Sequence, residues 1–294
     1  MPENIPEQSE KELKTRFLPP WKVFILEAFL FCLTLGLGIA SAFKLNEFLK
    51  TQEISLPQIS FWQFLLYFLF ATLFILIFSY LGRRIKKGRG FIFKAIFVLA
   101  FAWGGLITLS LWMLDIFALI LIAILIFGWL RNPTVLLHNL CMIFGIAGIG
   151  SLLGLQIPPL IIVFLLIAFS VYDFIAVYKT KHMIKMAKEM IEAGAILAMI
   201  VPPRISDFLA DLKEVKPGGR FLILGGGDIA FPLLLCTSLV PEGILNSSIV
   251  AIFALIGLFA SFWFFISQKI RQPIPALPPI ALFSIIGFLI TRII

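Results

Sequence analysis

Runs of about 20 predominantly apolar residues recur along most of the chain, and they limit its fold more than any other feature. A run of this length crosses the hydrocarbon core of a bilayer as an α-helix. Of the 294 residues, 61% are hydrophobic, well above the usual share in a soluble domain. A soluble globular fold is therefore excluded, and we expect a polytopic membrane protein.

The sequence predicts an all-α protein with nine transmembrane helices. The apolar runs are continuous, whereas the strands of a membrane barrel would alternate apolar and polar residues. The expected spans are 21–43, 59–82, 91–114, 115–131, 132–154, 157–178, 220–240, 246–268 and 275–294.

Basic residues lie mostly at one set of span ends. The net charge is +8, and if the N-terminus is cytoplasmic, only Lys44, Lys50 and Arg292 of the 24 Lys and Arg residues fall outside. Cytoplasmic loops of membrane proteins carry such an excess of positive charge. We therefore expect a cytoplasmic N-terminus and an extracytoplasmic C-terminus, and we attribute the basicity to orientation rather than to nucleic-acid binding.

This topology divides the chain into four expected parts: a flexible cytoplasmic tail (1–20), an N-terminal bundle of five or six helices (21–154, with 155–180), a cytoplasmic loop (181–219) and three C-terminal helices (220–294). Within the loop, residues 182–203 form an amphipathic stretch that ends in two prolines, Pro202 and Pro203. Such a stretch favours a helix that lies at the membrane interface and ends at Pro202.

Three acidic residues lie clearly within expected spans, namely Glu27, Asp173 and Asp228. An ionisable residue inside a membrane is costly, so each one is a functional candidate. For Glu27, near the cytoplasmic end of the first span, snorkelling or pairing with a nearby base is a sufficient explanation. His138 and Asn139, which are adjacent in a later span, are expected to form hydrogen bonds between helices.

The two aspartates are expected at nearly the same depth. Asp173 precedes Lys179 by six residues, which is ~9 Å of helix. Asp228 follows Arg220 by eight residues, or ~12 Å. If their helices face each other, the two carboxyl groups meet and hold a proton between them. Aspartic proteases use such a pair as base and acid in the attack of water on a peptide bond, and that chemistry requires neither metal nor cofactor.

Three consecutive glycines, Gly225, Gly226 and Gly227, precede Asp228. Without side chains there, water and an extended peptide could approach the carboxylate closely. Close packing of helices through small residues is the alternative explanation. The acid pair at matching depth favours the functional interpretation.

Three short motifs, VYDF, GGGD and PAL, lie in this order in the sixth, seventh and ninth spans. In this combination the chain resembles the presenilin and signal peptide peptidase family of intramembrane aspartyl proteases, which carries YD, GxGD and PAL motifs on the same helices. The resemblance implies a nine-helix presenilin-like fold with Asp173 and Asp228 as the catalytic pair. It also implies that the site is shaped by neighbouring motif residues, here Tyr172, Gly225, Gly226, Gly227, Pro275, Ala276 and Leu277.

The resemblance further implies an endopeptidase whose substrates are transmembrane helices or remnant signal peptides, and whose unwound substrate pairs as a strand near the site. The four prolines of RQPIPALPP independently indicate non-helical backbone there, which must be buried in protein or meet water. The compact chain favours a prokaryotic presenilin homologue in the cell (inner) membrane, acting without obligate partner subunits, alone or as a homo-oligomer.

Two other functions use similar features. A proton- or cation-coupled transporter also pairs acids with broken helices, although the spans show no obvious internal repeat. A prepilin peptidase also uses a glycine-rich GD motif, but IAFP follows Asp228 in place of the basic residue usual there.

Overall fold

The computed structural model describes residues 20–84, 88–179, 190–192, 194, 196–216, 219–268 and 273–293. The expected tail, apart from Pro20, and residues 182–189 of the expected interfacial helix lie outside the described residues. The α-helices are α2 (Pro20–Thr51), α3 (Phe61–Arg84), α4 (Gly88–Ser110), α5 (Asp115–Arg131), α6 (Val135–Gln156), α7 (Pro159–Tyr178), α9 (Gly226–Ser238), α10 (Ile244–Ile266) and α11 (Leu277–Thr291). Two strands, β1 (Ala198–Val201) and β2 (Leu222–Gly225), and three 3-10 helices, η1 (Ile205–Leu209), η2 (Leu212–Glu214) and η3 (Val240–Glu242), complete the described elements.

Each of these α-helices falls largely within one expected span, and the bounds of α5 are the expected ones. Among the described residues, α2, α6, α7 and α10 contain segments long and apolar enough to cross a membrane. Shorter apolar helical segments lie in α3 and α4, and α11 is a third. A multi-pass membrane protein is confirmed, and the crossing of all nine helices stays a prediction.

The expectation of an all-α fold is wrong at one place, because β1 and β2 form a two-stranded antiparallel sheet. Ala198 pairs with Gly225, and Val201 pairs with Leu222. The expected helix over 220–240 therefore begins only at Gly226, and the expected interfacial helix gives way to a strand at Ala198.

The strand β1 forms because α6 supplies partners for its backbone. The amide nitrogen of Asn139 donates to the carbonyl oxygen of Ile200 at 2.7 Å, and the backbone N–H of Ile200 donates to the Asn139 amide oxygen at 2.9 Å. The ring nitrogen Nε2 of His138 lies 3.0 Å from the carbonyl oxygen of Ala198. The expectation that His138 and Asn139 bond to another helix is therefore wrong, since both bind a strand.

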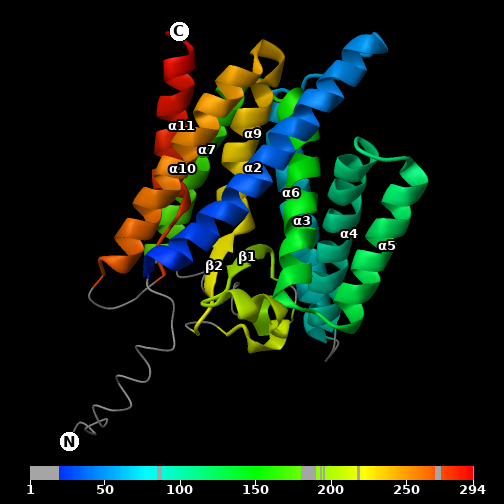
Figure 1. Cartoon of the computed structure of the whole chain (residues 1–294), viewed down its shortest axis with the longest axis vertical. Helices are drawn as coiled ribbons and strands as arrows, with labels where there is room; N and C mark the ends of the chain where they lie inside the picture. Colours follow the sequence, from blue (N-terminus) through cyan, green and yellow to red (C-terminus); the bar gives the residue numbers. More distant parts are fainter. Residues whose placement is uncertain are drawn as a thin grey trace, which may run out of the picture.

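The helix α6 is central to the packing, since α2, α4 and α9 all lie against it. The main apolar core combines α2, α6, α7, α9, α10 and α11 with both strands, and a second cluster joins α4, α5 and α6 to the strands and η2. Figure 1 shows the two strands at the same end of the bundle as the start of α2, and the end of α11 at the opposite end. The junction of β2 and α9 thus lies at the expected cytoplasmic end.

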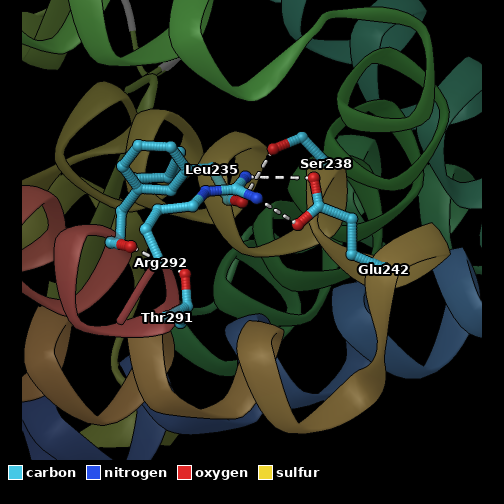
Figure 2. A network of polar contacts seen from close by, with 6 residues as sticks. Leu235, Ser238, Glu242, Thr291 and Arg292 are labelled. Carbon is cyan, nitrogen blue, oxygen red and sulfur yellow. Dashed lines mark hydrogen bonds and ion pairs between the residues drawn. The ribbon is translucent and has the colours of Figure 1, made fainter. Parts of the chain in front are cut away.

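A bidentate ion pair joins α11 to the turn after α9 at the opposite end of the bundle (Figure 2). The guanidinium of Arg292 donates to the two carboxylate oxygens of Glu242 at 2.8 and 3.0 Å, and it stacks over the ring of Phe288. An exposed pair contributes little to stability, but the two-point geometry fixes the relative position of the two segments. The helices α11 and α9 also contact each other directly.

Replacement of Asn139 by Ala tests the contact between α6 and β1. The N–H and C=O of Ile200 would lose their partner in a buried place, at a cost of about 2 kcal/mol or more. We expect the unfolding temperature in detergent to fall by several degrees. Asn132→Ala is the control, because Asn132 is exposed and caps α5 through its backbone N–H. Equal unfolding temperatures for the two variants would contradict this role of Asn139.

Candidate active site

Asp228 is the third residue of α9 and is held by the strand that precedes it. The chain leaves β2 at Gly225 and enters α9 at once, and the N–H of Gly226 extends the pairing by donating to the carbonyl oxygen of Leu197. The side chain of Asp228 is 8% exposed. Because the sheet and the helix fix both sides of this short junction, the carboxyl group has a defined position.

Asp173 lies on α7 and faces the same region. It is 5% exposed and interacts electrostatically with Asp228. The backbone of Leu277, the first residue of α11, also interacts with its carboxyl group. Since α7, α9 and α11 all contact one another, three motifs distant in the sequence meet at one place.

The PAL segment enters this site without regular structure. Residues 273–275 are neither helix nor strand, and α11 begins at Leu277 rather than at the expected Pro275. Pro275 and Leu277 are buried and Ala276 is half-buried. The expected irregular backbone is therefore present and largely packed within the protein.

The three glycines differ in what surrounds them. A Cβ atom on Gly225 would lie 2.8 Å from the carboxylate oxygen Oδ2 of Asp228, so a side chain at this position would force that carboxylate to shift. A Cβ on Gly226 would lie 3.0 Å from the carbonyl oxygen of Leu197, which is a tight contact with backbone. On Gly227, a Cβ would meet only the ring of Phe231 at an ordinary 3.6 Å.

Tyr172 is not gathered into the buried site, since its side chain is 56% exposed. One residue along an α-helix turns the side chain by about 100°, so Tyr172 and Asp173 face different directions. Tyr172 is therefore placed to contact a molecule that lies alongside α7 rather than to contact the carboxyl pair.

A cavity of about 140 Å³ lies beside β2. Its walls include Leu222, Ile223 and Leu224 from the strand, and residues 273, 274 and 276 from the segment before α11. Side chains of a strand alternate between its two faces, so three consecutive residues border one cavity along the strand edge. Within the described residues the sheet has two strands, and the cavity therefore lies along the edge of β2 that β1 does not occupy.

Glu27, on α2, belongs to this region, and the expectation that it snorkels or pairs with a base is wrong. It is 5% exposed, and its oxygen Oε2 has no hydrogen-bond partner among the described residues. It lines the cavity and interacts electrostatically with Asp228. Its depth could have indicated this, because Glu27 lies six residues from the start of its expected span and Asp173 lies five residues from the end of its own.

Comparisons with known proteins identify a family and two structures of similar fold. Residues 26–294 match the family model described as signal-peptide peptidase, presenilin aspartyl protease. A presenilin-family intramembrane aspartate protease, solved in space group C222, superposes with a TM-score of 0.62 at 18% identity, over 92% of this chain and 98% of that chain. The structure of such a protease in space group P2 gives 0.60 at 20% identity, over 90% and 96%. These two likenesses show a common fold, and a search of curated proteins found no significant match.

Replacement of Gly225 by Ala tests whether this glycine makes room for the carboxyl group. The new methyl group would displace the Asp228 carboxylate, and we expect cleavage of a single-span substrate in liposomes to fall about tenfold or more. Gly227→Ala adds the same methyl group where it meets only an ordinary contact, so its loss should be much smaller. Equal losses in the two variants would contradict the steric role of Gly225.

Proposed function

The chain belongs to the signal-peptide peptidase and presenilin family of intramembrane aspartyl proteases, and on that premise we propose that Asp173 and Asp228 are its catalytic pair. The observation that carries this proposal is that two buried carboxyl groups, on helices that pack together, interact electrostatically beside the first residue of α11. Burial supports the assignment, because carboxyl groups are seldom buried without a role.

The pair acts by general base and general acid catalysis on a water molecule. Two carboxyl groups in one site hold one proton between them. The ionised group takes a proton from the water, whose oxygen attacks the peptide carbonyl carbon, while the protonated group donates to the carbonyl oxygen. Protonation of the nitrogen then allows the C–N bond to break, which releases a carboxyl and an amino end and leaves one proton on the pair.

The substrate must first lose its helical hydrogen bonds, since these shield its peptide bonds from water. One edge of β2 has no partner strand among the described residues, and this supports a way to hold the unwound part, because an extended peptide can pair with such an edge. The cavity along that edge gives room for one of its side chains. A strand held there runs beside Leu222–Gly225 and leads toward Asp228.

We propose single transmembrane helices and remnant signal peptides as the substrates, in agreement with the small amount of chain outside the expected spans. The basic residues favour a cytoplasmic position for the end of the bundle that carries the strands. Cleavage is then expected in the cytoplasmic half of the bilayer. The cell membrane is the proposed location, with no obligate partner subunit.

Asp173→Asn and Asp228→Asn test the proposed pair, because each keeps the shape of the side chain and removes its acid–base function. With purified protein in liposomes, we expect each variant to lose cleavage of a single-span substrate by a factor of about 10³ or more. The control is Asp115→Asn, which changes an exposed aspartate at the start of α5 and should retain cleavage. If cleavage survives either replacement within the pair, the protease assignment of these residues is wrong and ion flux becomes the next measurement.

A further inference from the structure

The buried carboxyl group of Glu27 has no function in the two-aspartate mechanism. Its oxygen Oε2 lacks a hydrogen-bond partner among the described residues, although the side chain is 5% exposed. An unpartnered polar group in such a place costs free energy, and an ionised one costs more. A hydrogen-bond donor brought into the cavity by a ligand would remove that cost.

The cavity that Glu27 lines has a definite chemical character. Its other walls are apolar apart from Ser261, and they include Leu222, Phe262, Phe265 and Ile274. Its volume of about 140 Å³ is close to that of an engineered cavity of ~150 Å³ that holds benzene, so one side chain of moderate size fits. A cavity lined mostly by apolar side chains, with the carboxyl group of Glu27 on its wall, suits a long aliphatic stem with a cationic end, which is the form of lysine and arginine.

The position of the cavity relative to Asp228 says which part of a substrate would reach it. The wall residues Leu222–Leu224 precede Asp228 and lie toward the expected cytoplasmic end of the bundle. A substrate strand paired with this edge would project alternate side chains toward the cavity, from residues on the cytoplasmic side of the cut. Membrane spans carry an excess of Lys and Arg at that flank.

We propose that Glu27 is the specificity-determining residue of a subsite that receives a lysine or arginine side chain from the cytoplasmic flank of the substrate. The inference rests on the proposed protease function, since it assumes a substrate strand along β2. It assigns Glu27 a contact with the substrate that the catalytic pair does not make. The enzyme then selects spans by the position of their first basic residue as well as by their tendency to unwind.

The experiment uses the purified full chain in liposomes and a series of single-span substrates. The substrates differ at one test residue, which is Lys, Gln or Glu. The position of this test residue is moved stepwise along the cytoplasmic side of the cut. For each enzyme the measured quantity is the ratio of kcat/KM for the Lys substrate to that for the Glu substrate. A ratio within one enzyme cancels any general effect that Glu27 has on catalysis through its interaction with Asp228.

We expect one substrate position at which the wild-type enzyme prefers Lys over Glu by about tenfold or more, with Gln between them. The ratio should approach one in Glu27→Gln and should invert in Glu27→Lys. Glu47→Gln is the matched control, because Glu47 is an exposed glutamate on the same helix, and it should keep the wild-type ratio. If Glu27→Lys does not fold, Glu27→Gln decides alone, since it preserves the shape of the side chain.

The inference is overturned if the Glu27 variants keep the wild-type ratio at every position, or if the wild type cleaves Gln and Lys substrates equally well. The second result would indicate a subsite for a neutral donor instead of a cation. Asp173→Asn and Asp228→Asn in the same assay show whether the subsite alone is wrong or the proposed protease function is wrong as well. If those two variants still cleave, the protease assignment falls and the subsite falls with it.

Discussion

The site depends on the hydrogen bonds of β1. This strand pairs with Asn139 on one side and with β2 on the other. In a membrane protein, non-helical backbone persists only where the protein or water supplies its hydrogen bonds. Asn139 supplies two of them to Ile200, and β2 supplies the opposite edge. The sheet in turn fixes Gly225 and Gly226, and the helix that begins there positions Asp228. A side chain on α6 thus supports a carboxyl group that lies far from it in the sequence.

The sequence predicted the helical part of the fold because the thickness of the bilayer core sets the length of each apolar run. Each run meets this requirement independently of the rest of the chain. The bounds of α5, for example, are those expected from hydropathy. It did not predict β1, because residues 198–201 take their hydrogen-bond partners from Asn139 and from β2, which are distant in the chain. An apolar run that is short and buried on both faces does not by itself distinguish a strand from a helix.

Within the site, the two aspartates could be predicted because their depths and motifs are visible in the chain. Their burial on helices that pack together agrees with that expectation, while their catalytic role stays a proposal. The proposed role of Glu27 could not be predicted from its depth and a motif in this way. Its burial arises from the packing of α2 against α10 and the segment before α11, which hydropathy does not encode. The three glycines likewise look equivalent in sequence, but only the structure separates Gly225 from Gly227.

The most direct measurement of the central claim is the binding of an aspartyl-protease transition-state isostere that carries a hydroxyl group in place of the scissile carbonyl. Calorimetry on the purified protein in detergent needs no knowledge of the natural substrate. If Asp173 and Asp228 hold one water-binding site together, the isostere binds once per chain, and replacement of either aspartate by Asn weakens binding by about 100-fold or more. Unchanged affinity in either variant would contradict the account, because the two carboxyl groups would then not form a common site.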